Sequence, residues 1–215
     1  MPQPQRHSNS SALSASHGPH AEEIVDVAVA LAEEVGWANV RLRRVAERVG
    51  VPLSEVLVHF RDLDGVADAW FGRALAAMVA APESGFAKLP ARERVYLVLM
   101  RWFDANVGHR RVTGEMVRSK LYPSHPHHWV PMIFSLSRLI QWVRETALLD
   151  AGGLRRQVEE VGLTDLFLAT LAVWLADRSD GQERTRRFLR GRLAEADRIL
   201  SFAPGERRTR LPPVQ

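Results

Sequence analysis

Apolar residues recur every three or four positions along almost the whole chain, which is the spacing of one face of an α-helix. No stretch alternates between apolar and polar residues as a half-buried strand does. Glycine, proline and acidic capping residues interrupt the pattern and mark the ends of the expected helices. These span residues 21–35, 42–49, 53–60, from 62 or 64 to about 80, 92–107, 111–121, 128–149, 154–176 and 182–202. The sequence therefore predicts an all-α protein of about nine helices.

A Pro/Gly-rich segment, "APESGFAKLPA" at residues 81–91, is the best candidate for a boundary between two units. Residues 21–80 would form a small N-terminal head, and residues 91–202 a larger helical bundle. Residues 1–20 are rich in Ser, Pro, His and Asn, so we expect a disordered arm there. Residues 203–215 would form a flexible tail.

Within the head, the two short helices at 42–49 and 53–60 are separated only by Gly50, Val51 and Pro52. This spacing is typical of a helix-turn-helix, in which the second helix lies in the major groove of DNA. The whole chain carries a net charge of +4. Between Arg41 and Arg61, five arginines stand against two glutamates, a modest local excess of positive charge that suits a phosphate backbone.

The head resembles the TetR family of transcriptional regulators over about residues 22–75. The residues that fall into register with the family's signature are Gly36, Trp37, Leu42, Arg43, Val45, Ala46, Gly50, Val51 and Phe60. The resemblance implies a three-helix head that reads DNA and a larger bundle that binds a ligand and dimerises. On this basis we expect a ligand-responsive repressor. Its operator would be a palindromic DNA duplex, because the two heads of a dimer read two half-sites about one DNA turn apart.

The head departs from the family at four positions. Arg41 and Pro52 stand where the family usually has a capping Ser or Thr. Leu57 and Leu63 stand where the family often has a Tyr and a Lys that contact phosphate. A leucine donates no hydrogen bond to phosphate, so DNA binding is left open at this stage. Ser54 and Glu55 could reach base edges, and Leu53 could contact a thymine methyl group. The candidate DNA-binding residues are Arg41, Arg43, Arg44, Arg48, Leu53, Ser54, Glu55, His59 and Arg61.

The larger bundle has aromatic residues at core-like positions, and the family often holds a small apolar effector between these helices. The candidate pocket residues are Trp102, Phe103, Trp129, Phe134, Trp142, Phe167 and Trp174; plain core packing explains them equally well. The resemblance also implies a homodimer through the last two long helices. Residues that would suit that interface are Phe167, Leu171, Leu175, Phe188 and Leu189.

Other functions find little support in the sequence. It has no Gly-rich phosphate loop, no Gly-x-Ser-x-Gly elbow and no paired carboxylates at a telling spacing, so we expect no enzyme and no cofactor. Cysteine is absent, and His125, His127 and His128 match no known metal motif, so we expect no metal site. No apolar run reaches the roughly 18 residues needed to span a bilayer. We therefore expect a cytoplasmic protein.

One alternative rests on "LATLAVWLADRSDGQERTRRFLRGRL", residues 168–193. This stretch resembles the C-terminal part of the TetR-shaped ubiquinone-biosynthesis accessory protein, which binds lipid. The resemblance implies an isoprenoid ligand and a vestigial helix-turn-helix. In that case Leu53, Leu57 and Leu63 would form an apolar patch for a membrane or a partner.

Overall fold

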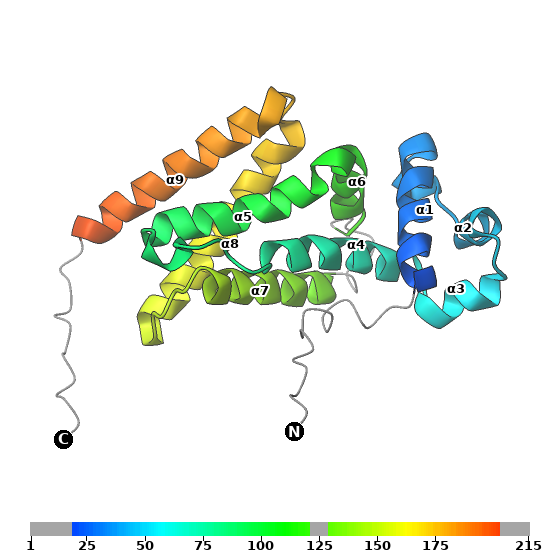
Figure 1. Ribbon diagram of the computed structural model, residues 1–215, viewed down its shortest axis with the longest axis horizontal. Coiled ribbons are helices and arrows are strands. Elements are labelled where there is room, and N and C mark those ends of the chain that lie inside the picture. Colours follow the sequence, from blue (N-terminus) through cyan, green and yellow to red (C-terminus); the bar gives the residue numbers. More distant parts are fainter. Residues whose placement is uncertain (1–18, 121–128, 203–215) are drawn as a thin grey trace, which may run out of the picture.

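The computed structural model describes residues 19–120 and 129–202, with side chains described from His20 to Lys120 and from Ser135 to Arg198. These parts of the chain contain α-helices and short 3-10 helices, and no strand (Figure 1). The elements are α1 (Pro19–Val35), η1 (Trp37–Asn39), α2 (Leu42–Val49), α3 (Leu53–His59), α4 (Leu63–Met78), η2 (Phe86–Lys88), α5 (Ala91–Asn106), η3 (Val107–His109), α6 (Arg110–Lys120), α7 (Trp129–Thr146), α8 (Gly153–Ala176), η5 (Asp180–Gln182) and α9 (Glu183–Phe202). The predicted all-α class is confirmed. The expected arm, the tail and the three histidines near residue 125 lie outside the described residues.

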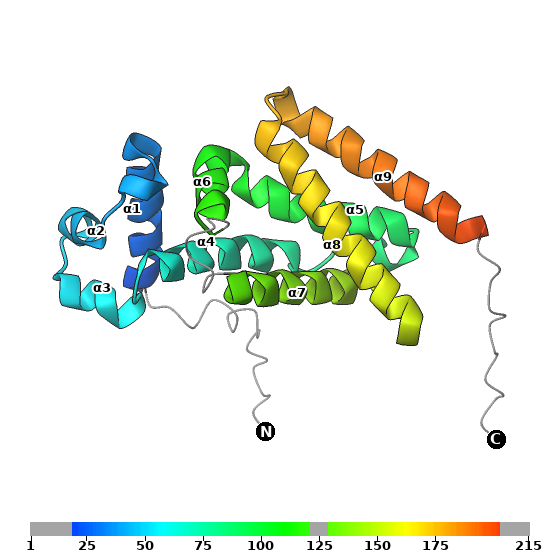
Figure 2. The same ribbon diagram turned by 180° about the vertical axis from the view of Figure 1, so that it is seen from behind.

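The helices are arranged as a small head and a larger body. Figure 1 shows α1, α2 and α3 at one end, with α4 and α6 leading from them into the body. Seen from behind in Figure 2, α8 crosses the body and α9 runs back alongside it. Within the described helices, no stretch is both long and apolar enough to cross a membrane.

Two hydrophobic cores hold these parts together, and they meet within α4. Trp70 belongs to the head core, whereas Ala74 and Met78 on the same helix belong to the body core. The head core also contains Val112 and Met116 from α6, both fully buried. The packing therefore changes along α4, ahead of the Pro/Gly-rich segment, and α6 contributes to the head from the far side of that segment.

Local capping explains where the short helices of the head begin and end. Gly50 ends α2 with a φ of 84°, a left-handed conformation that glycine adopts without a steric penalty. Asp62 caps α4, because its Oδ1 accepts a hydrogen bond of 2.8 Å from the Gly65 backbone N–H. Leu63, one residue later, is half-buried and packs against the head core. The ammonium group of a lysine at this position would have to extend past the apolar neighbours to reach water.

A buried carboxylate, Asp177, organises the corner between α8 and α9. Its side chain accepts hydrogen bonds from the backbone N–H and the hydroxyl of both Ser179 and Thr185, at 2.6 to 2.9 Å. Burial alone would raise the pKa of Asp177, but these four hydrogen bonds outweigh it and hold the pKa well below the usual range. Ser179 also caps the start of α9, since its Oγ accepts from the Arg184 N–H at 3.1 Å.

We predict that Asp177→Asn destabilises the protein by about 2 kcal/mol near neutral pH, because hydrogen bonds to a charged acceptor are replaced by weaker ones. The folded-state pKa is lowered, so the carboxylate stabilises the fold above its unfolded pKa of about 3.9 and loses this effect as the pH falls further. Urea unfolding at pH 7 and pH 3 measures both effects, and the difference between wild type and variant should shrink at pH 3. Asp180→Asn, one turn away and exposed, is the matched control. Equal stability of both variants at pH 7 would contradict this role.

Candidate nucleic-acid interface

The α2–α3 unit is held by a small number of inward-facing residues. Val45, Ala46, Val56 and Phe60 are buried in the head core. The backbone N–H groups of Gly50 and Val51 both donate to the Ala46 carbonyl, at 2.9 and 3.1 Å, and this closes the turn. With these residues facing inward, the opposite faces of α2 and α3 are left at the surface.

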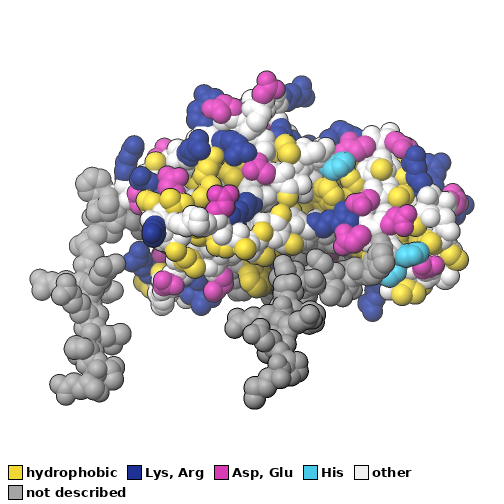
Figure 3. Space-filling model, in the orientation of Figure 1, with side chains coloured by type: hydrophobic (Ala, Val, Ile, Leu, Met, Phe, Trp, Pro, Cys, Tyr) yellow, Lys and Arg dark blue, Asp and Glu magenta, His cyan; other side chains and the backbone are white. Residues whose placement is uncertain are grey.

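Three arginines on this surface are available for phosphate. Arg44 and Arg61 are exposed, and their side chains form no hydrogen bond or ion pair within the described part of the chain. Arg43 forms only an exposed i,i+4 contact of 3.8 Å with Glu47, and such pairs contribute little. In Figure 3, dark-blue side chains gather along the right-hand edge of the head, on the side where Figure 1 places α2.

The other two candidate arginines have partners within the head. Arg41 donates from Nη1 to the carbonyls of Ala38 and Val40, at 2.9 and 2.8 Å, and so supports the turn before α2. Arg48 forms an ion pair of 2.8 Å with Glu34 of α1, and its hydrogen bond lowers the pKa of Glu34. Both arginines therefore tie α2 to α1 and its turn. To contact phosphate they would have to share or leave these partners.

The outward face of α3 is mostly apolar. Leu53 and Leu57 are 49% and 62% exposed, and Val58, which sequence reasoning missed, is 79% exposed. A helical projection with Val56 and Phe60 inward would have placed Val58 outward. Ser54 is exposed beside them.

The two remaining candidates on α3 have neighbours inside the head. Glu55 lies 3.1 Å from His20 Nδ1, at the start of α1. His59 is half-buried, with its ring tilted against that of Phe60. Polar groups of α3 that could reach a base edge are therefore few.

The candidate pocket residues divide into three groups. Trp102, Phe103, Phe167 and Trp174 are buried and form one aromatic cluster, with ring centroids 5.2 to 6.4 Å apart. Trp142 lies at the surface and is 46% exposed. The side chains of Trp129 and Phe134 lie outside the described residues.

Polar atoms within the aromatic cluster are only partly paired. Trp174 Nε1 donates to Gln182 Oε1 at 2.6 Å. Trp102 Nε1 is buried and has no hydrogen-bond partner in the described structure. No group of three or more His, Cys, Asp or Glu residues that could hold a metal ion occurs among the described residues.

The interface residues suggested from the sequence need correction. Phe167, Leu171 and Leu189 are buried in the core of their own chain, so they are not available to a second copy. Leu175 is half-buried and packs against the same core. Phe188, also half-buried, lines a shallow surface depression on α9 together with Arg184, Arg187, Gly191, Arg192 and Glu195. Periodicity alone does not say which apolar face of a helix meets its own chain.

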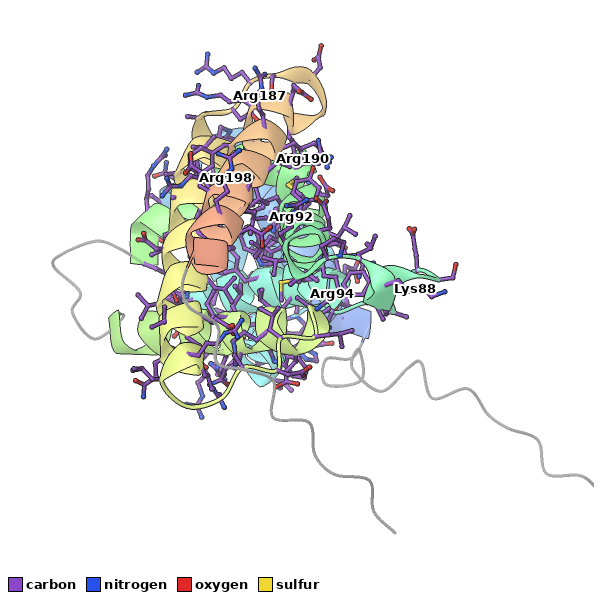
Figure 4. The ribbon with its side chains drawn as sticks, turned by 90° about the vertical axis from the view of Figure 1, so that its left-hand side faces the viewer. Lys88, Arg92, Arg94, Arg187, Arg190 and Arg198 are labelled. Atoms are coloured by element: carbon purple, nitrogen blue, oxygen red, sulfur yellow. The ribbon has the colours of Figure 1, made fainter. Side chains whose placement is uncertain are left out.

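A second group of basic side chains lies at the end of the body away from the head, where Figure 4 labels six of them. Arg94 donates to the carbonyls of Leu89, Ala147 and Leu148, and Arg92 pairs with Asp197 at 2.8 Å. The guanidinium of Arg190 lies over the ring of Tyr96, 4.5 Å from its centroid. These three arginines are thus engaged with their own chain.

Helix α6 fastens the head to the body. Arg111 donates to the carbonyls of Ala32 and Glu33 at the C-terminal end of α1, and to the Glu33 carboxylate. Glu115 accepts a hydrogen bond of 2.6 Å from the Trp37 backbone N–H in the turn between α1 and α2. One turn of α6 therefore fixes both the end of α1 and the beginning of the α2–α3 unit.

This combination of a three-helix head, a short turn and a separate helical body defines a helix-turn-helix regulator fold. A solved TetR transcriptional regulator from Nitrosomonas europaea is 40% identical to this chain, with a TM-score of 0.74, and the match covers 83% of this chain and 98% of that one. The chain therefore belongs to the TetR family of transcriptional regulators.

More distant structures share the fold alone. A TetR transcriptional regulator from Rhodococcus is 18% identical over 86% of this chain and 100% of its own, with a TM-score of 0.62. A TetR-like regulator from the same genus is 15% identical over 89% of this chain and 99% of its own, with a TM-score of 0.55. No protein-family model and no curated protein matches the sequence. The 40% identical structure is a transcriptional regulator, so that match favours a regulator over the lipid-binding accessory protein.

We predict that Glu115→Ala loosens the turn before α2, because the Trp37 N–H loses its charged acceptor. A hydrogen bond to a charged group contributes about 1.5–3 kcal/mol, so amide exchange at Trp37 should accelerate at least about tenfold. Hydrogen exchange followed by NMR measures this directly. Glu93→Ala, on an exposed turn of α5, is the control and should leave Trp37 unchanged. Unaltered exchange at Trp37 in the Glu115 variant would contradict the role of α6.

Proposed function

We propose that this protein is a homodimeric, DNA-binding transcriptional repressor that a small apolar effector releases from a palindromic operator. The observation that carries the proposal is the surface of the head, where Arg43 and Arg44 on α2 and Arg61 just after α3 are exposed. The 40% identity to a TetR transcriptional regulator supports the same function. In this proposal α3 lies in the major groove and the arginines contact phosphates on either side of it.

The proposed dimer uses the outward face of α8. Leu154, Val158, Val161, Asp165, Leu168 and Ala172 are exposed and alternate in steps of four and three residues. This is the spacing of a seam that packs against a partner helix, and four of the six side chains are large and apolar. The depression on neighbouring α9 brings Arg184 and Arg187 within the same surface, where Asp165 of a second copy could pair with them.

The effector would act through the body and α6. The aromatic cluster lies between α5 and α8 and consists of Trp102, Phe103, Phe167 and Trp174. The Nε1–H of Trp102 is unpaired and could donate a hydrogen bond to an oxygen of a ligand. Arg110 at the start of α6 donates to the Asp177 carbonyl and lies over the Trp174 ring, 5.1 Å from its centroid. A ligand that favours a different position of α6 would change the separation of the two heads and so lower DNA affinity.

The proposed function is tested with the purified protein and its own upstream DNA, across a range of salt concentrations. Specific binding that falls steeply with salt is expected, since several arginines would displace counterions. A reporter driven by the same DNA should rise when the protein is removed, as expected for a repressor. Affinity for this DNA no higher than for random duplex at every salt concentration would overturn the proposal.

We predict that Arg44 and Ser54 contribute to DNA binding in different ways. Arg44→Ala should weaken binding to specific and random duplexes by the same factor and reduce the salt dependence by about one counterion. Ser54→Ala should instead change the preference among sequences, because its hydroxyl would face base edges. Fluorescence anisotropy titrations measure both effects. Lys88→Ala, an exposed cation far from the head (Figure 4), is the control, and an equal loss in this variant would show that Arg44 has no special place.

We predict that the proposed dimer depends on Leu168. Leu168→Arg should convert a dimer into a monomer, because an unpaired charge buried in an apolar interface costs about 3 kcal/mol or more. Sedimentation equilibrium measures the change. Leu97→Arg replaces a leucine of similar exposure on α5 and should remain dimeric. A dimer of wild-type strength in the Leu168 variant would exclude this face of α8.

A further inference from the structure

The recognition helix exposes an apolar ridge at the point where a DNA-reading helix usually carries polar groups. Leu53, Leu57 and Val58 lie on the same outward face of α3 and are 49%, 62% and 79% exposed. Only Ser54 lies beside them as a free polar side chain, since Glu55 is already paired with His20. Figure 3 shows yellow side chains at the lower right of the head, where Figure 1 places α3. Leaving such side chains in water is unfavourable, so the ridge calls for an apolar partner.

The charges around the ridge narrow the identity of that partner. Arg43 and Arg44 are exposed on α2, and Arg61 is exposed just after α3, so the head carries cations as well as the apolar strip. A matching surface must present anions as well as apolar groups. The major groove of DNA does this wherever it contains thymine, because phosphates line the groove and the thymine C5-methyl group projects into it.

We propose that α3 selects its operator by contacts of Leu53, Leu57 and Val58 with thymine C5-methyl groups. This inference rests on the proposed DNA-binding function and adds its source of specificity. Hydrogen-bond readout is left mainly to Ser54, because Glu55 is paired with His20 and His59 is half-buried against Phe60. Each buried methyl group should contribute about a fourfold preference for thymine over the same base without its methyl.

The test uses a duplex selected by the full-length wild-type protein from random-sequence DNA. A second version of this duplex carries deoxyuridine in place of thymine, which removes the methyl groups and keeps the base pairing. Wild-type protein should bind the deoxyuridine duplex about fourfold more weakly per contacted thymine, and more weakly still where several contacts add. The same titrations with random duplex give the non-specific reference.

Variants of the ridge separate methyl contacts from any effect of deoxyuridine on DNA stiffness. Leu57→Ala and Val58→Ala should bind the two duplexes with a smaller ratio than wild type, whereas Arg44→Ala should weaken both and leave the ratio unchanged. The replaced side chains are exposed, so the variants should melt at the wild-type temperature. Retention of the full ratio in all ridge variants would overturn the inference.

The remaining outcomes also decide the matter. A selected duplex that binds equally well with thymine and with deoxyuridine overturns the inference and leaves DNA-binding regulation intact. Failure to select any preferred duplex overturns both proposals. Binding to vesicles containing phosphatidylserine that is lost in Leu57→Ala, together with no DNA preference, assigns the ridge to a membrane surface and also overturns it.

Discussion

The structure depends on the contact between α6 and the end of α1. A three-helix head of about 40 residues buries little apolar surface by itself, so it gains from any additional core residues. Val112 and Met116 of α6 supply them, and Arg111 donates to the carbonyls of Ala32 and Glu33 in the last turn of α1. The head is therefore completed by the body. A displacement of α6 must alter the head, which provides a physical path between the body and the exposed surface of α2 and α3.

Local signals in the sequence predict the helices of this protein, but they do not predict the contacts between residues that lie far apart in the chain. The range 42–49 was predicted as it stands, because Gly50 ends α2 in a conformation that glycine readily adopts. The role of Glu115 was not foreseen, since its partner, the Trp37 N–H, lies 78 positions away in the chain. Asp177 shows the same limit at shorter range, because its four hydrogen bonds require a corner that no single helix specifies.

The sequence identified candidate residues of the head but not the hydrogen bonds and ion pairs that several of them form within it. The two unusual leucines of the head have opposite roles, since Leu63 packs in the head core and Leu57 faces solvent. Sequence alone treats them alike. Arg41 and Arg48 look like Arg44 in the sequence, but their charges are already engaged by carbonyls and by Glu34. The aromatic residues show the same effect, since four of them cluster while Trp142 lies at the surface.

In the proposed function, the head separates two tasks that polar recognition helices often combine. Arginines on α2 and after α3 would supply attraction that every duplex shares and that salt screens, because it arises from displaced counterions. The apolar ridge on α3 would supply contacts that depend on base identity and are nearly insensitive to salt, because no charge is involved. Ionic strength would therefore change how tightly such a head binds far more than it changes which sequence it prefers. A helix with few polar readers can still be selective if its apolar side chains meet methyl groups in the groove.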